Sequence, residues 1–266
     1  MGPLALVAAF GLLIGAGSSE VRKFERLAAD HIKATLKGEA PVVTVKSKFS
    51  GYVAGPLGDL ASVAIHGHSF GTDGLPLFTE PGPTRGRIRN LELALRDFRL
   101  GKLDVARIRA DIPECRFDYD LALRRKQIRL THSGEGTGEV EVAAASLQDF
   151  IVRKFGEIKR CTVTLSRDRI IVEGYGEFII VKTDFRVSAR LRIEEGRRFY
   201  LDEAFISFGD RFADEASAKV LLDLLNPVVD LDRDLGLHGA IDVQGLRLEH
   251  NVLRVWGAAR IPKRPE

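Results

Sequence analysis

The stretch Phe-Arg-Val-Ser-Ala-Arg-Leu-Arg-Ile at residues 185–193 alternates apolar and polar side chains without a break. Successive side chains of a β-strand point to opposite faces of the sheet, so this stretch predicts a strand with one apolar and one polar face. The same alternation recurs along most of the chain. We therefore expect a long, curved, mostly antiparallel sheet whose apolar face encloses either a core or, where it is wide enough, a lipid.

The composition is that of a globular protein. The 266 residues are 45% apolar and 29% charged, which is enough for one or two domains with a sizeable core. The net charge of +3 is a small imbalance, so no whole-molecule field favours a nucleic-acid partner. A local basic patch would still be enough to contact anionic lipid headgroups. We expect no nucleic acid and no cofactor, and nothing identifies a protein partner.

The first residues differ from the rest of the chain. Residues 3–17 carry no charge, and small residues follow their apolar centre, which is typical of a secretory signal peptide. The run is shorter than the roughly 20 apolar residues of a membrane span. We expect residues 1–17 to be removed on export or kept as an N-terminal anchor. Residues 18–262 would then form a single elongated domain with a charged tail at 263–266, in the periplasm or cell envelope.

Helical periodicity appears three times, and strand patterns fill the intervals. The predicted helices cover residues 19–37, 144–155 and 213–225. The predicted strands cover 42–49, 60–66, 88–98, 103–112, 117–123, 127–132, 138–142, 162–165, 169–173, 177–193, 199–208, 240–248 and 251–261, the first seven as a meander. Residues 71–86 are rich in Gly and Pro, which indicates an irregular linker. The predicted fold class is α+β, with long curved antiparallel sheets wrapped around helices.

Four local strings, taken with this order of elements, resemble one known family. They are the first helix running into residues 42–49 and Gly55-Pro56-Leu57, the stretch 142–147 (Val-Ala-Ala-Ala-Ser-Leu), the stretch 224–231 (Leu-Leu-Asn-Pro-Val-Val-Asp-Leu), and the closing hairpin at 241–257. The chain resembles the bacterial LmeA-like phospholipid-binding family, which is similar to tubular lipid-binding proteins. The resemblance implies an envelope protein that binds phospholipid in an apolar groove or tunnel without turning it over.

The candidate lipid contacts come from the alternating strand and from the third helix. They are Phe185, Val187, Ala189, Leu191, Ile193, Val220 and Leu224, and the small Ala189 would leave room for an acyl chain. Burial of each acyl methylene contributes about 0.8 kcal/mol, so a tunnel needs no special motif. The same alternation also describes an ordinary packed core. An envelope scaffold or interaction protein with a dry core is therefore the second hypothesis.

The sequence Gly67-His68-Ser69-Phe70-Gly71 matches the G-x-S-x-G pattern of lipases and esterases. In those enzymes a helix follows the serine, and residues 72–76 of this chain are unsuited to a helix. A serine esterase that uses Ser69 is the third hypothesis, beside a simple glycine-rich turn.

Three further patterns resemble ligand sites but also have an ordinary structural explanation. Asp230-x-Asp232-x-Asp234 begins like a calcium loop but lacks the required Gly and Glu at its sixth and twelfth positions, which favours a polar connection. The glycines of residues 134–138 predict a hairpin turn. Two arginine sets fit either headgroup contacts or a solvated sheet face; they are Arg85, Arg87, Arg89, Arg96 and Arg99, and Arg186, Arg190, Arg192, Arg197 and Arg198.

The chain has two cysteines, Cys115 and Cys161, in separate predicted strands. An exported protein can hold a disulfide, and lone cysteines are as often small buried apolar residues. Both alternatives stay open on the sequence alone.

Overall fold

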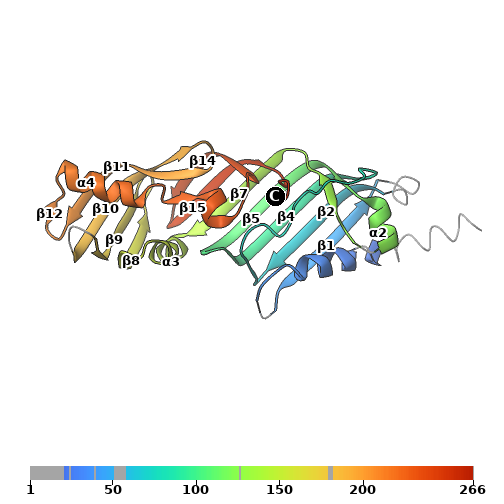
Figure 1. The fold of residues 1–266 in the computed structure, drawn as a ribbon, viewed down its shortest axis with the longest axis horizontal. Coiled ribbons are helices and arrows are strands. Elements are labelled where there is room, and N and C mark those ends of the chain that lie inside the picture. The colour runs from blue at the N-terminus through green and yellow to red at the C-terminus, as the bar shows by residue number, and fades with distance from the viewer. Residues whose placement is uncertain are drawn as a thin grey trace, which may run out of the picture.

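The computed structural model describes residues 21–23, 25–38, 40–50, 58–125, 127–178 and 182–265. The predicted leader at residues 1–17 and the predicted turn at 55–57 lie outside the described residues. Two sheets lie end to end in an elongated molecule, and the C-terminus ends near its middle (Figure 1). The fold is therefore the predicted α+β arrangement of long curved sheets with few helices.

The first sheet is built from the N-terminal half of the chain and the closing hairpin. Its strand order is β1-β2-β4-β5-β7-β15-β14, with β3 beside β4 and β6 beside β5. The strands are β1 (Val42–Phe49), β2 (Asp59–His68), β3 (Gly71–Thr72), β4 (Gly86–Leu100), β5 (Leu103–Phe117), β6 (Leu130–His132), β7 (Gly136–Ala143), β14 (Ile241–Glu249) and β15 (Val252–Ala259). Within this sheet, β2 and β3 run parallel to β4, and the other described pairings are antiparallel.

The second sheet contains the alternating stretch. Its order is β12-β11-β10-β9-β8, with β13 beside β11, and its pairings are antiparallel. The strands are β8 (Ile158–Leu165), β9 (Ile170–Glu177), β10 (Lys182–Glu194), β11 (Arg198–Phe208), β12 (Arg211–Phe212) and β13 (Val229–Asp230). Along β10 the side chains of Phe185, Val187 and Ala189 are buried, whereas Arg186 and Arg190 are exposed. The period of two in the sequence is thus confirmed as one buried and one solvated face.

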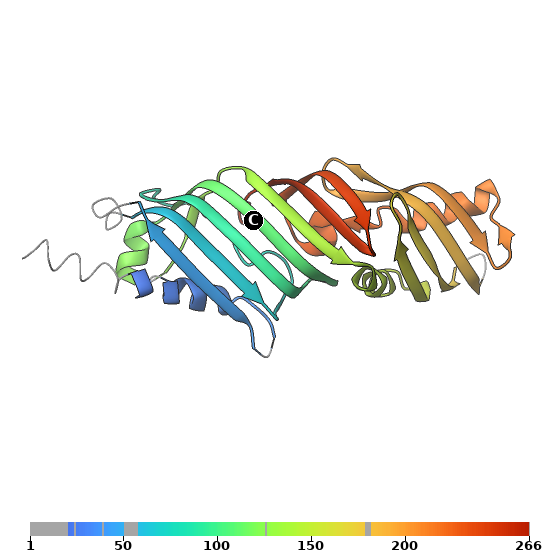
Figure 2. The same cartoon turned by 180° about the vertical axis from the view of Figure 1, so that it is seen from behind.

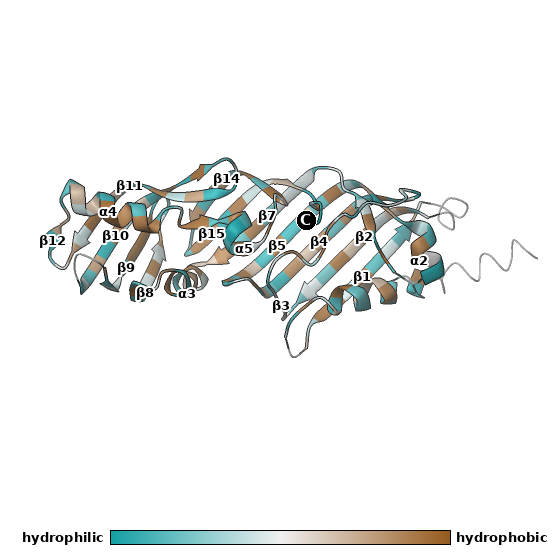
Figure 3. Ribbon diagram, in the orientation of Figure 1, coloured by the Kyte–Doolittle hydropathy of each residue, from teal (hydrophilic) through white to brown (hydrophobic). Residues whose placement is uncertain are grey.

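The helices lie on one side of the sheets. They are the N-terminal helix at residues 21–23 and 25–33, α2 (Tyr119–Arg125), α3 (Ala144–Lys154), α4 (Glu215–Leu225) and α5 (Leu231–Leu235). Figures 1 and 2 show α4, α5 and the connecting loops against one face of the sheets, while the other face is bare. The strands alternate along their length between apolar and polar residues (Figure 3). The apolar side chains form two cores, one under the first strands of the first sheet and one at the junction of the two sheets.

Two of the predicted elements are wrong. Residues 117–123 were predicted as a strand, but Tyr119–Arg125 form α2, because the buried side chain of Asp118 accepts a hydrogen bond from the Leu121 backbone N–H at 2.9 Å and caps the helix. The predicted hairpin turn at residues 134–138 is not a hairpin, since β6 and β7 both pair with β5. A Cβ at Gly136 would clash with the carbonyl oxygen of Asp111, so the backbones approach too closely there for any other residue.

The predicted meander is also only partly correct. The segment between β2 and β4 crosses over, so that these two strands pair in parallel, and β15 of the closing hairpin pairs with β7. The single strand predicted at residues 177–193 is divided between the end of β9 and β10, and residues 179–181 lie outside the described part of the chain. The hairpin itself is confirmed, and its turn residues His250 and Asn251 both have positive φ, as a type I′ turn requires.

Candidate functional site

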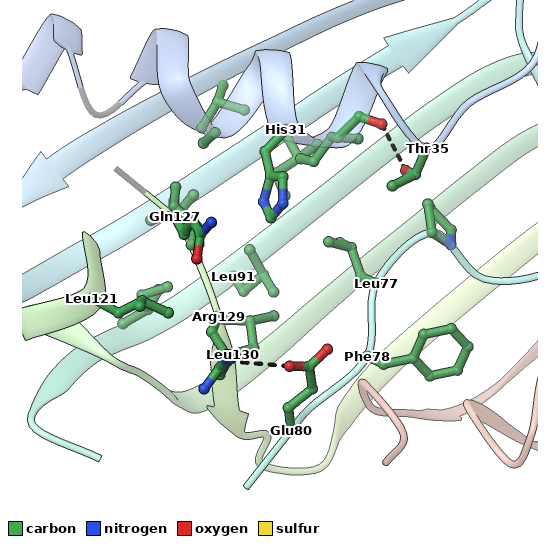
Figure 4. A pocket seen from close by; sticks show the side chains of 18 of the residues that line it. His31, Thr35, Leu77, Phe78, Glu80, Leu91, Leu121, Gln127, Arg129 and Leu130 are labelled. Atoms are coloured by element: carbon green, nitrogen blue, oxygen red, sulfur yellow. Dashed lines mark hydrogen bonds and ion pairs between the residues drawn. The ribbon is translucent and has the colours of Figure 1, made fainter. Parts of the chain in front are cut away.

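One candidate site is a cavity of about 350 Å³ against the first sheet, which we call the N-terminal cavity. Its floor is apolar and comes from β1, β2 and β4: Val45, Val63, Ile65, Ile88 and Leu91. Its walls come from the N-terminal helix, from residues 76–80, from α2 and from residues 127–130. Figure 4 shows Leu77, Leu91, Leu121 and Leu130 around this space, with His31 on the helix above it.

Residues 76–80, which we call the strap, belong to the Gly/Pro-rich segment and cover the cavity. Backbone hydrogen bonds hold the strap: Thr79 N donates to Pro262 O, and Glu80 N donates to Leu130 O, both at 2.8 Å. Arg264 N donates to Thr79 O at 3.1 Å. The strap, the segment before β6 and the C-terminal segment are therefore joined at the cavity. This segment was expected to be an irregular linker, and apart from the short β3 it is, but it also forms a wall of the site.

The polar groups of the N-terminal cavity lie at its rim. The Glu80 carboxylate contacts two guanidinium groups, with Oε2 at 3.1 Å from Arg129 Nε and Oε1 at 2.8 Å from Arg264 Nη2. The exposed fractions of these side chains are 28% for Glu80, 37% for Arg129 and 65% for Arg264. Figure 4 shows the pair of Arg129 and Glu80 beside Leu130. The site thus combines an apolar floor with a charged edge, which is the arrangement that an amphiphile fits.

The second cavity lies at the junction of the two sheets, and we call it the junction cavity. Its volume is about 80 Å³, and all of its lining residues are apolar. They come from α3, from α5 and its flanks, and from both sheets: Leu103, Val105, Val142, Phe150, Leu191, Leu235, Val243 and Val255 are among them. Ligand sites usually measure about 300–1,000 Å³, so the junction cavity is below that range and the N-terminal cavity is within it.

The predicted lipid contacts do not gather around one cavity. Phe185, Val187 and Ala189 are buried in the second sheet's packed core, and Ile193 packs against that core. Leu191 lines the junction cavity. Val220 and Leu224 lie on the outward side of α4 with 50% and 37% of their surface exposed, whereas Leu221 and Leu225 of the same helix are buried. No described cavity unites these residues, and their contact with lipid stays a prediction.

The acidic pattern after α4 serves the structure. Asp230 Oδ1 accepts hydrogen bonds from the backbone N–H groups of Asp232 and Arg233 and caps α5. Asp234 pairs with Lys154 of α3 at 2.6 Å, and Lys154 Nζ also donates to the carbonyls of Pro227 and Val228. These contacts are the polar connection that the sequence favoured. Among the described residues no group of three or more His, Cys, Asp or Glu side chains is arranged to hold a metal ion.

Ser69 occupies a turn between two strands. It has φ of 60°, and its hydroxyl lies 3.0 Å from Nδ1 of His68. The residues after it enter β3, which pairs with β4, so no helix follows the serine as an esterase elbow requires. The glycine-rich turn is the interpretation that this geometry favours.

Most arginines of the two sets lie beside carboxylates on the solvated face of the sheets. The pairs include Arg87–Glu114, Arg89–Asp59, Arg99–Asp104, Arg186–Glu173, Arg190–Glu203 and Arg198–Asp230. A carboxylate beside each of these guanidinium groups opposes the binding of an anionic headgroup there. The ion pairs therefore favour the solvated sheet face over the headgroup site for these arginines.

Both cysteines are free thiols, so the structure decides against a Cys115–Cys161 disulfide. Cys115 lies in the core below the N-terminal cavity and Cys161 in the core at the junction. Burial raises the pKa of each thiol to about 11. They act as small apolar residues.

A family model described as LmeA-like phospholipid-binding matches residues 73–257. The chain belongs to this family. The match covers the strap, Arg129 and the junction of the two sheets, whereas the N-terminal helix and Arg264 lie outside it. Searches of curated proteins and of solved structures find no match. In the described part of the chain, no helix is both long and apolar enough to cross a membrane.

The sequence interpretation missed the N-terminal cavity. Its lining residues come from eight separate segments between residues 28 and 264, so no local pattern contains them. One signal was present: the strap carries Leu77 and Phe78 inside a segment otherwise rich in Gly, Pro and polar residues. Consecutive large apolar side chains in an irregular segment indicate that the segment packs against something.

Proposed function

We propose that the protein binds phospholipid non-catalytically in the bacterial cell envelope and that the N-terminal cavity holds the acyl part of the lipid. The observation that carries the proposal is the cavity itself, with about 350 Å³ of space above an apolar floor and charged groups only at the rim. Membership of a phospholipid-binding family supports the class of ligand.

The two cavities support this choice by their difference in size and lining. Each acyl methylene removed from water contributes about 0.8 kcal/mol, so affinity grows with the length of chain that a cavity admits. The junction cavity holds about 80 Å³, which is a gap in a packed core rather than space for a chain.

The envelope location rests on the predicted leader at residues 1–17. Its test is the intact mass of protein recovered from a bacterial envelope fraction. A mass that lacks the leader supports export with cleavage, and an envelope-bound chain of full mass supports the anchor. Full-length protein in the cytoplasmic fraction alone contradicts the location.

Lipid binding is tested by purifying the full chain without detergent and measuring bound lipid by native mass spectrometry and by extraction. We expect phospholipid at about one molecule per chain, as one cavity of this size implies. A folded protein without lipid, which also takes up none from phospholipid vesicles, contradicts the proposal. That result favours the dry-core scaffold, which the tight burial of Phe185, Val187 and Ala189 also fits.

The variant Leu77→Trp tests whether the lipid is bound in the N-terminal cavity. Leu77 is half-buried on the strap and borders the cavity, so the larger ring fills space there without entering a sheet. We expect the bound lipid to fall at least fivefold. The matched control is Leu246→Trp, because Leu246 is also half-buried but packs against the junction core. Equal loss of lipid in both variants contradicts the assignment to the N-terminal cavity.

A further inference from the structure

The rim of the N-terminal cavity has an unusual ratio of charges. Two guanidinium groups, from Arg129 and Arg264, share the one carboxylate of Glu80, which leaves a local net charge of +1. On the bare face of the first sheet the charges balance, since the guanidinium groups of Arg254 and Arg107 share the carboxylates of Glu139 and Glu141. Cations in excess of carboxylates at the edge of an apolar cavity favour an anionic group on the occupant.

The three side chains of this cluster are held in position by the backbone around them. Glu80 is on the strap, Arg129 immediately precedes β6, and Arg264 follows β15, and the backbone hydrogen bonds at Thr79 and Glu80 join these segments. The backbones that carry the two guanidinium groups are thus joined beside the apolar floor, and both groups contact Glu80. A guanidinium carries five N–H donors in a planar fork, which is more than one carboxylate oxygen accepts. Its geometry also matches two oxygens of a phosphate.

We propose that Arg129 and Arg264 bind the phosphodiester of an anionic phospholipid at the mouth of the cavity, with Glu80 positioning both guanidinium groups. This inference rests on the proposed function and specifies its ligand. An anionic lipid brings one negative charge, which balances the +1 of the cluster. A zwitterionic lipid brings an ammonium group as well, and that group meets the guanidinium groups with like charge. The mouth therefore selects lipids without a headgroup cation.

The test offers the full chain vesicles of equal phosphatidylglycerol and phosphatidylcholine with identical acyl chains. The protein is then separated from the vesicles, and the bound lipids are counted by native mass spectrometry. We expect about a fivefold excess of phosphatidylglycerol, the scale of one partly solvated charge interaction. The double variant Arg129→Gln/Arg264→Gln is expected to lose this preference, so that the ratio of the two bound lipids falls to within about twofold.

Two other variants separate selectivity from damage to the fold. Arg89→Gln/Arg254→Gln removes the same charge from the bare face, where Arg89 pairs with Asp59, and should keep the roughly fivefold ratio. Glu80→Gln raises the local charge from +1 to +2 and should increase the preference for phosphatidylglycerol. A variant that merely loosened the strap would not increase it.

Inorganic phosphate distinguishes a lipid site from a site for the free ion. We expect excess phosphate to leave the bound lipid in place, because the acyl chain supplies most of the binding. Displacement of the lipid by phosphate overturns the proposal in favour of an ion site. Equal uptake of both lipids by the unaltered chain, or a ratio that survives the Arg129→Gln/Arg264→Gln double variant, also overturns it and leaves the proposed function standing. Uptake of neither lipid overturns both.

Discussion

The N-terminal cavity and the junction cavity both lie against apolar side chains of the first sheet, yet they differ in what closes them. The junction cavity is closed by α3, α5 and strands of both sheets, and all of its lining is apolar. The N-terminal cavity is closed by a short helix, an irregular strap and a charged rim. The junction keeps only a small void of about 80 Å³, as a close-packed interior does, whereas the N-terminal cavity keeps about 350 Å³. The comparison separates a region that holds the fold together from a region available to a ligand.

Truncation at the junction should have the largest effect on stability. Phe150 of α3 is 1% exposed and lines the junction cavity. We expect Phe150→Ala to lower the free energy of unfolding by about 3–5 kcal/mol, because it enlarges a void that rigid elements cannot close. Urea denaturation measures the change. If Phe150→Ala left the free energy of unfolding unchanged and lowered the amount of bound lipid, that result would contradict the division between the two regions.

The ion pair beside the junction should have the next largest effect. Lys154 and Asp234 have 18% and 16% of their side-chain surfaces exposed, and the lysine also binds two backbone carbonyls. Lys154→Met leaves Asp234 and those carbonyls without their cation, so we expect a loss of about 2–3 kcal/mol in the free energy of unfolding. Lipid content should not change in the folded variant. Lys219→Met, which removes an exposed pair with Asp223, is the control and should cost under about 1 kcal/mol.

The alkylation rates of the two cysteines test the two regions separately. Since both thiols have a pKa near 11, only about a thousandth of each is thiolate at pH 8, and alkylation of the native protein should be slow. Bound lipid should slow the reaction of Cys115 by about tenfold, because opening of that core then requires release of the lipid. Cys161, in the other core, should react at an unchanged rate. Mass spectrometry of alkylated peptides gives both rates, and equal protection would locate the lipid elsewhere.

The smallest expected effect concerns an ion-pair contact between the first sheet and α3. Asp104 of β5 accepts hydrogen bonds from Arg99 of β4 and from Arg153 of α3. Partial burial alone would raise the pKa of Asp104, but these hydrogen bonds outweigh it and hold the pKa below its ordinary value of 3.8. The stabilisation is therefore present above pH 3.8 and is lost as the pH falls through the lower, folded-state pKa.

Asp104→Asn should thus cost about 0.5–1 kcal/mol at pH 7. The difference from the unaltered protein should disappear in acid, once the aspartate is protonated. Thermal unfolding across this pH range measures it. If the loss of stability in Asp104→Asn stayed constant down to pH 2, the substitution would act through something other than the negative charge of Asp104.

Local patterns predicted the fold well where one face is buried. The alternation of residues 185–193 became β10, and the closing hairpin and α3 are near their expected bounds. The errors arose where a single side chain or a long-range pairing decides the structure. Asp118 begins a helix in a stretch with strand-like residues, and the parallel pairing of β2 with β4 depends on where the Gly/Pro segment runs. The N-terminal cavity could not be predicted for the same reason, because it exists only after distant segments meet.

The most direct test of the account is photocrosslinking with a phospholipid that carries a diazirine near the middle of its acyl chain, followed by peptide mapping. We predict crosslinks to the walls of the N-terminal cavity, at Ile32, Leu77 and Leu91 and their neighbours. Crosslinks concentrated in β10 or on the outward side of α4, at Val220 and Leu224, would contradict the account and support the contacts predicted from the alternating strand and third helix.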